Sequence, residues 1–166
     1  MNIFITMSLI NNDKTDKINE KESNVKETPE KESNVKETPE IFMELSVKHM
    51  NQIIHLLDTG KKDELKAIVI KMGAEWCGPC QKIKPLVLSC IKHMPPNVIC
   101  FDIDADDNME LYSFFKNKRL LNGIPAILCY TQNPERDPEK WYIPDMSVLG
   151  SDQNQIKHLF KTIFES

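Results

Sequence analysis

The sequence lacks any long apolar run, and it also lacks an excess of basic residues. No stretch approaches the ~20 apolar residues that a helix needs to cross a bilayer, so no membrane association is expected. The formal net charge is -4 and lysines are interspersed with glutamates, so no nucleic-acid partner is expected either. The apolar residues 1–10 have no basic segment and no small-residue cleavage site, so we expect no signal peptide.

The sequence has five cysteines but only one closely spaced pair, Cys77 and Cys80. An odd number with one close pair does not fit the disulfide framework of a secreted protein, so a cytoplasmic location is expected. A zinc site would need a second close pair or a histidine at ligand spacing, and we expect no metal. The other cysteines, Cys90, Cys100 and Cys129, are expected to be small buried hydrophobes.

Residues 1–40 are expected to form a disordered tail, because they are rich in Lys and Glu and hold almost no aromatic residues. The tail contains a ten-residue unit, Lys21 to Glu30, that is repeated unchanged from Lys31 to Glu40. Two copies with one Val each cannot bury a core. They represent either recent repeat slippage or a docking or phosphorylation segment.

Residues 41–166 are expected to form one folded domain of alternating strands and helices. Strands are predicted over residues 41–45, 67–72, 98–104, 126–130 and 146–149. Helices are predicted over residues 46–57, 80–93 and 109–115, with a last one capped by Ser151 or Asp152. Strands separated by helices should pair in parallel, and the last two strands should form a hairpin. The result is an α/β fold, with a mixed sheet of about five strands flanked by four helices.

The stretch Trp76-Cys77-Gly78-Pro79-Cys80 lies where the apolar strand 67–72 hands over to a helix. Cysteines at this spacing can close a small disulfide ring or supply half a metal site. Unpaired N–H groups and the helix dipole stabilise a thiolate at a helix N-terminus. A thiolate is the nucleophile of thiol–disulfide exchange. Gly78 and Pro79 keep the turn tight, and a proline just inside a helix costs no hydrogen bond.

Several further features complete a resemblance to the thioredoxin family. The stretch Ala74 to Cys80 matches the active-site signature of that family. Pro85 falls at its helix-kinking proline, Pro125 at its cis-proline, and Gly150 at a glycine near the end of its last strand. The resemblance covers residues 41 to about 164 and implies the thioredoxin fold.

The resemblance also implies roles for individual residues. Cys77 would be the exposed nucleophile and Cys80 the more buried resolving thiol. A cis bond before Pro125 would leave the Ile124 backbone free to pair with an extended substrate. The expected substrate surface comprises Trp76, Gly123, Ile124 and Pro125. Trp76 could instead simply pack over the end of the helix.

Lys71 departs from the family pattern. Thioredoxins usually have a buried Asp six residues before the first cysteine and a partner Lys on the next strand, where this chain has Lys71 and Cys100. The usual charge pair is therefore expected to be absent. Lys71, together with Gly78 and Pro79, is expected to tune the ionisation of the two thiols. Lys71 could favour a thiolate, act as a neutral base, pair with a carboxylate such as Asp102, or extend to the sheet edge.

The sequence thus predicts a protein-disulfide reductase that cycles between a dithiol and a disulfide at Cys77 and Cys80, without a cofactor. A protonated Lys71 would make it a better oxidant, or a slower reductase, than a typical member of the family. The resemblance implies protein disulfides as substrates and a reductase as electron donor, and we expect a monomer. The alternatives are an oxidase or isomerase, and a non-catalytic binding module. Trp141 and Tyr142, in the proline-rich connection 131–144, either bind a partner or pack over the sheet edge.

Overall fold

The computed structural model describes residues 39–60 and 63–166. Nearly all of the predicted tail lies outside the described residues, so its disorder stays a prediction. Five strands form one sheet: β1 (Ile41–Phe42), β2 (Ala67–Gly73), β3 (Val98–Asp104), β4 (Ala126–Thr131) and β5 (Met146–Leu149). The α-helices of the described residues are α2 (Val47–Thr59), α3 (Gly78–Lys92), α4 (Met109–Asn117) and α5 (Gln153–Glu165).

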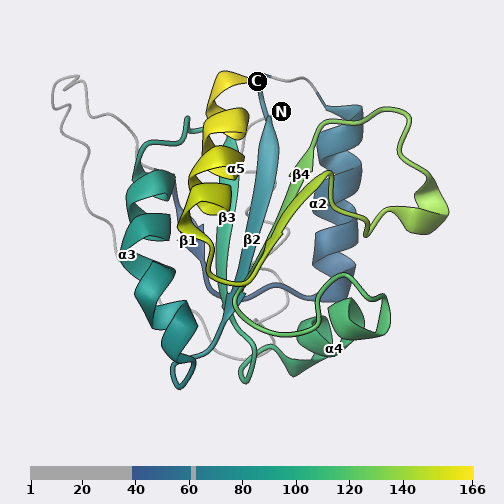
Figure 1. The fold of residues 1–166 in the computed structure, drawn as a ribbon. Helices are drawn as coiled ribbons and strands as arrows, with labels where there is room; N and C mark the ends of the chain where they lie inside the picture. The colour runs from purple at the N-terminus through teal and green to yellow at the C-terminus, as the bar shows by residue number, and fades with distance from the viewer. Residues whose placement is uncertain (1–38, 61–62) are drawn as a thin grey trace, which may run out of the picture.

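The sheet has the strand order β1-β3-β2-β4-β5, which places β2 at its centre (Figure 1). β1 and β2 both pair in parallel with β3, and β4 and β5 form the predicted antiparallel hairpin. β4 runs antiparallel to β2, so the expectation that all strands separated by helices pair in parallel was wrong. The reason is that the short α4 does not return the chain to the end of the sheet where β2 begins. β4 therefore starts at the end of the sheet where β2 finishes, with Ala126 opposite Met72.

The helices begin at residues that cap them. Ser46 accepts a hydrogen bond from the His49 N–H at the start of α2, and Asp152 accepts two at the start of α5. In both helices the predicted apolar face is buried, with Ile54 and Ile156 among its members. The caps and the apolar periodicity thus fix both helices against the sheet.

Two apolar cores lie on opposite faces of the sheet. The first core packs α2 and α4 against β2, β3 and β4, and includes Phe101, Phe115 and Tyr130. The second core packs α3 and α5 against the other face, and includes Cys100 and Cys129. Figure 1 shows α3 and α5 covering one face while α2 lies on the other. Because successive side chains of a strand alternate between faces, β2 supplies both cores.

Arg136 anchors the connection between β4 and β5. Its guanidinium donates hydrogen bonds to Asp58 of α2 at 2.8 Å and to Asp145 at 2.8 Å. It also donates to the carbonyls of Ile143 and Thr131, at 3.0 and 2.9 Å. Burial alone would lower the pKa of Arg136, but hydrogen bonds to the two carboxylates raise it. The long connection is therefore tied to α2.

Two other expectations need correction. β1 spans two residues rather than the predicted five, because its pairing with β3 ends at Phe42. Trp141 and Tyr142 do not cover the sheet edge. Instead their rings lie 5.8 and 5.7 Å from that of Phe114 in α4, and these aromatic contacts hold the connection against the first core.

Candidate functional site

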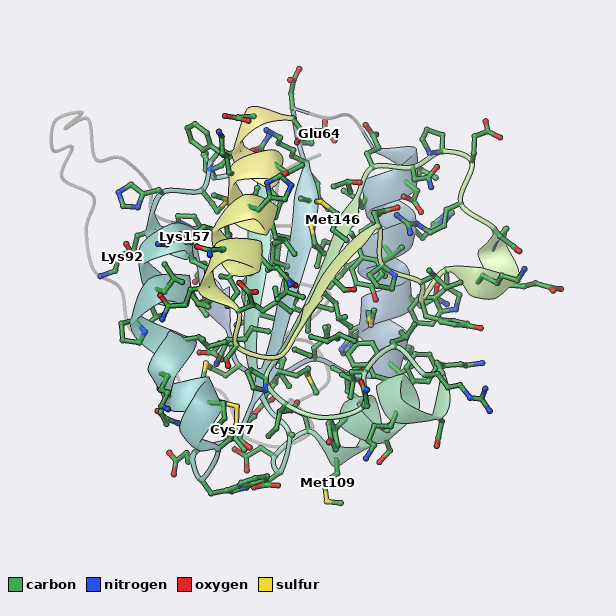
Figure 2. All side chains as sticks on the ribbon, viewed as in Figure 1. Glu64, Cys77, Lys92, Met109, Met146 and Lys157 are labelled. Carbon is green, nitrogen blue, oxygen red and sulfur yellow. A yellow bond between two sulfur atoms is a disulfide. The ribbon has the colours of Figure 1, made fainter. Side chains whose placement is uncertain are left out.

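Cys77 and Cys80 lie at the N-terminus of α3 and are joined by a disulfide (Figure 2). Cys77 is the N-cap residue of the helix, and its Sγ accepts a hydrogen bond from the Cys80 N–H at 3.3 Å. Pro79 occupies the first turn, where its missing N–H would have had no partner. The motif therefore places the Cys77 sulfur where free backbone donors and the helix dipole stabilise negative charge.

Cys77 is buried in the disulfide form, with 4% of its surface exposed against 2% for Cys80. The expectation that Cys77 is exposed was therefore wrong for this state. The physical reason is that the disulfide turns both side chains inward, where they pack with Ala74 and Ile124.

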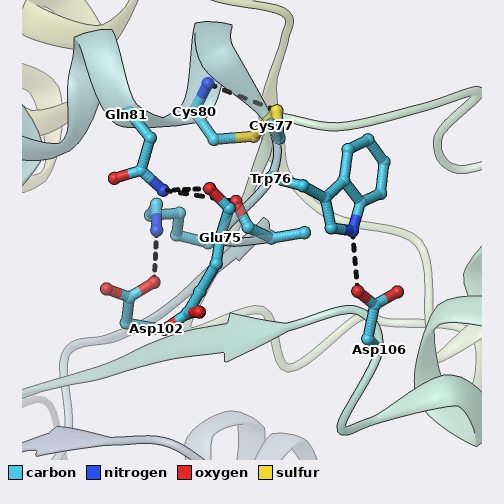
Figure 3. Close-up of a disulfide and its surroundings, with 9 residues drawn as sticks. Glu75, Trp76, Cys77, Cys80, Gln81, Asp102 and Asp106 are labelled. Carbon is cyan, nitrogen blue, oxygen red and sulfur yellow. Dashed lines mark hydrogen bonds and ion pairs between the residues drawn. A yellow bond between two sulfur atoms is a disulfide. The ribbon is translucent and has the colours of Figure 1, made fainter.

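Trp76 directly precedes Cys77 in the chain and is 72% exposed. Its indole N–H donates a hydrogen bond of 2.7 Å to the Asp106 carboxylate, as Figure 3 shows. Because most of its surface faces solvent, Trp76 does not simply pack over the helix end. Nothing in the spacing of Asp106 from Trp76 revealed this contact.

Gln81 is a second contact that sequence reasoning missed. Its side-chain amide donates to the carbonyls of Ala74 and Glu75, at 3.3 and 3.1 Å. These bonds connect the first turn of α3 to the turn that precedes Cys77 (Figure 3). Gln81 therefore fixes the turn before Cys77 relative to the first turn of α3.

The Ile124–Pro125 peptide bond is cis, and Ile124 packs against the disulfide. The Pro125 carbonyl accepts a hydrogen bond from Gly150, whose positive φ of 99° suits a residue without a Cβ. Between the residues that the structure describes, no backbone hydrogen bond ends on Ile124. Of the predicted surface residues, Ile124 packs against the disulfide and Trp76 directly precedes Cys77, whereas Pro125 is buried and Gly123 is exposed.

Lys71 forms a buried ion pair with Asp102 on the neighbouring strand. The two residues are partners in the register of β2 and β3. The carboxylate–ammonium pair that the sequence analysis considered missing is thus present in reversed order, with the lysine on β2. Of the alternatives for Lys71, pairing with Asp102 is confirmed. Its influence on the thiols, like that of Gly78 and Pro79, stays a proposal.

Gly73 allows this ion pair to approach the disulfide. A Cβ at Gly73 would lie 3.3 Å from Lys71 Nζ and 3.7 Å from Cys80 Sγ. The ammonium and the resolving sulfur therefore flank the same glycine with no side chain of that residue between them. In Figure 3, Asp102 lies on the side of Cys80 away from Trp76. Sequence reasoning gave Gly73 no role, because its spacing alone does not show what approaches it.

The two remaining buried thiols stay protonated. Burial raises the pKa of Cys100 to about 12 and that of Cys129 further still. Cys90 is only partly buried, against expectation, because it lies at the edge between α3 and α5. Burial raises its pKa against the opposing charge of Lys157. None of the three has the stabilised anion that exchange needs.

Two surface hollows differ in their relation to the disulfide. The larger, about 620 Å³, lies between α2 and the β4–β5 connection, far from the chemistry. The smaller, about 510 Å³, is lined by Trp76, Glu75 and three aspartates and adjoins the disulfide. We assign the site to the second location because exchange chemistry needs the cysteines. Within residues 39–60 and 63–166, no three His, Cys, Asp or Glu side chains could hold a metal ion, and no helix could cross a membrane.

Comparisons with known proteins agree with this geometry. The thioredoxin family model matches residues 58–140. A thioredoxin H-type from Fagopyrum esculentum is 42% identical over 97 residues, which cover 58% of this chain and 72% of that protein. A thioredoxin from Geodia cydonium is 34% identical over 34% of this chain and 63% of its own length.

Solved thioredoxins share the fold. The crystal structure of Plasmodium falciparum thioredoxin superposes with a TM-score of 0.52 and 24% identity, covering 74% of this chain and 86% of that one. A poplar thioredoxin h superposes with a TM-score of 0.54 and 17% identity, covering 76% and 97%. The fold, the disulfide at the start of α3 and the matched family model together show that this chain belongs to the thioredoxin family of thiol–disulfide oxidoreductases.

Proposed function

We propose that this protein reduces disulfides in other proteins. The observation that supports the proposal most directly is the Cys77–Cys80 disulfide at the N-terminus of α3, beside the free Ile124 backbone. In the reduced protein, the Cys80 N–H and the helix dipole would stabilise a Cys77 thiolate. An extended substrate segment would pair with Ile124 and lie against Trp76.

The reaction would proceed in two exchange steps. The Cys77 thiolate attacks one sulfur of the substrate disulfide, forms a mixed disulfide and releases the other sulfur as a thiolate. The Cys80 thiol loses its proton to solvent and attacks Cys77 Sγ. The Cys77–Cys80 bond forms, the Cys77–substrate bond breaks, and its electron pair leaves on the second substrate sulfur. Two electrons thus pass from the dithiol to the substrate.

We further propose a reductase that returns two electrons to the disulfide, so that the protein acts in electron transport. A cytoplasmic location suits the single redox pair and the three protonated thiols. A monomer suffices, because one chain supplies both cysteines and the Ile124–Pro125 loop. We also propose that residues 41–166 form the thioredoxin domain that carries this chemistry.

The proposal is tested with insulin as the substrate and dithiothreitol as the electron source. Wild-type protein is expected to accelerate insulin reduction, and Cys80→Ser is expected to abolish turnover. Once reduced and freed of dithiothreitol, Cys80→Ser should trap insulin in a mixed disulfide through Cys77. Cys90→Ser, which removes a cysteine outside the site, is the matched control and should keep full turnover. Binding of insulin without turnover, in both redox states, would instead favour a binding module.

A further inference from the structure

The buried ion pair beneath the disulfide has a position that packing alone does not explain. Lys71 is 6% exposed and interrupts a strand whose other residues are apolar or glycine. An apolar side chain of similar length would fill the same space without the cost of desolvating a charge. The charge is therefore maintained next to Cys80 against a physical penalty.

We propose that Lys71 is a positioning residue for the second exchange step. Its ammonium stabilises the thiolate of Cys80, and Asp102 limits how much of that positive charge Cys80 experiences. The proposal deepens the proposed function, because it rests on the same dithiol cycle.

The geometry supports this assignment in two ways. First, Lys71 Nζ and Cys80 Sγ both lie within 4 Å of the position of a Cβ on Gly73, at 3.3 and 3.7 Å. Second, an ammonium has three N–H donors, and among the described residues the structure gives Lys71 Nζ one acceptor, Asp102. The ammonium therefore has donors available for an anion that forms on the α3 side.

Asp102 completes the arrangement from the other end. Its side chain is 14% exposed, against 7% for that of Lys71, so the carboxylate is the end of the pair nearer to solvent. The negative charge opposes a thiolate while the ammonium attracts it. The two charges should therefore act on Cys80 with opposite signs.

The proposed effect belongs to one chemical step. In the mixed disulfide, the Cys80 thiol gives its proton to solvent before its sulfur forms the bond to Cys77 Sγ. The ammonium stabilises the anion that precedes this attack. No external oxidant or reductant enters the step, because the electron pair of the broken Cys77–substrate bond leaves on the substrate sulfur.

The test measures the step directly with a small aromatic disulfide, 5,5′-dithiobis(2-nitrobenzoate), in a stopped-flow experiment. The attack of Cys77 on the reagent releases the first coloured aromatic thiolate and leaves the other half bound to Cys77 as a mixed disulfide. The attack of Cys80 on Cys77 Sγ then releases the second coloured thiolate. Lys71→Met is expected to raise the pH midpoint of the second release by about one unit. Because a more basic thiol is also more nucleophilic, the rate at neutral pH should fall by only about threefold.

Asp102→Asn should shift the midpoint of the second release in the opposite direction, and the double variant Lys71→Met with Asp102→Asn should fall between the two. The matched control is Asp58→Asn, which breaks an ion pair of nearly equal exposure, 7% and 13%, on the other face of the sheet. It should leave the midpoint unchanged. Opposite shifts cannot come from a general loss of stability, which would move both variants in the same direction.

The proposal is overturned if Lys71→Met and Asp102→Asn shift the midpoint in the same direction, if neither shifts it, or if Asp58→Asn shifts it equally. Should Lys71→Met not fold, Asp102→Asn alone remains decisive, because it must lower the midpoint. A protein that fails to reduce insulin can still react with the aromatic disulfide. Failure of the proposed function is therefore distinguishable from failure of this inference.

Discussion

Among the described residues, the ion pairs Lys71–Asp102 and Arg136–Asp58 lie on opposite faces of the sheet, and they are nearly equal in exposure but unlike in their surroundings. Arg136 and Asp58 have side chains 7% and 13% exposed, and Lys71 and Asp102 have 7% and 14%. The Arg136 guanidinium donates to two carboxylates and two carbonyls, so its donors are occupied by structure. The Lys71 ammonium stands beside the disulfide. The same kind of interaction thus builds a connection on one face and adjoins the chemistry on the other.

The largest effect on stability is expected from Arg136→Met. The variant leaves the largely buried Asp58 and the more exposed Asp145 without their cation, and the loss of one partner of a buried pair costs about 3–5 kcal/mol. The rate of thiol–disulfide exchange per folded molecule should not change, because Arg136 lies on the face opposite to α3. Urea unfolding and the aromatic disulfide assay measure the two quantities separately.

Lys140→Met is the matched control for Arg136→Met. It removes a cation from the same connection, but the side chains of Lys140 and Asp137 are 63% and 50% exposed. Its cost should be under about 1 kcal/mol. Equal losses in the two variants would show that the Arg136 network does not anchor the connection.

The next largest effect on stability is expected from the buried thiol of Cys100 at alkaline pH. Burial raises its pKa from 9.0 to about 12, whereas the unfolded chain releases the proton near the ordinary value. The unfolded state then binds fewer protons, so stability is complete below about pH 9 and falls as pH rises, by about 1.4 kcal/mol per pH unit. Cys100→Ala should make this slope shallower.

The measurement for Cys100→Ala is the free energy of unfolding at several alkaline pH values, and the slope is compared rather than the absolute stability. Cys90→Ala serves as the control, because Lys157 opposes the effect of burial on the pKa of Cys90. It should retain most of the slope. An unchanged slope in Cys100→Ala would mean that the thiol ionises in the folded protein.

A smaller effect on stability is expected from Tyr130→Phe in the first core. The Tyr130 hydroxyl donates a 2.8 Å hydrogen bond to the Tyr142 carbonyl and helps to hold the connection that Arg136 anchors. Its loss should cost about 1 kcal/mol. Tyr112→Phe, which leaves this bond intact, should cost less in the same urea titration. If both cost the same, the hydroxyl of Tyr130 adds nothing to the anchoring.

The local parts of the fold and site were predictable from the sequence, because short-range signals determine them. The caps Ser46 and Asp152, the apolar strand before the cysteines and the proline at the start of α3 each act over a few residues. They place the two cysteines at a helix N-terminus before any tertiary contact is known.

The remaining features depend on how distant segments meet. β4 runs antiparallel to β2 because the chain leaves α4 at the end of the sheet where β2 ends. Asp58, the partner of Arg136 in α2, is 78 residues away from it in sequence. The proximity of Lys71 to Cys80 depends on the register of β2 and on Gly73 lacking a Cβ. The sequence allowed Asp102 as a partner of Lys71, but only as one of several alternatives.

The smallest effect on stability is expected when both members of the Lys71 pair are replaced, as in Lys71→Met with Asp102→Leu. A buried ion pair exchanged for apolar residues of similar volume is often neutral or stabilising, by about 1–4 kcal/mol. The free energy of unfolding should therefore stay the same or rise. The second thiolate release should then be influenced by neither charge. Arg136→Met with Asp58→Leu should still lose stability, because Asp145 loses its cationic partner and the carbonyls of Ile143 and Thr131 lose the guanidinium donors. A loss of several kcal/mol in the Lys71 double variant would contradict this contrast. Lys71 would then be a structural anchor like Arg136, and its place beside Cys80 would need no chemical explanation.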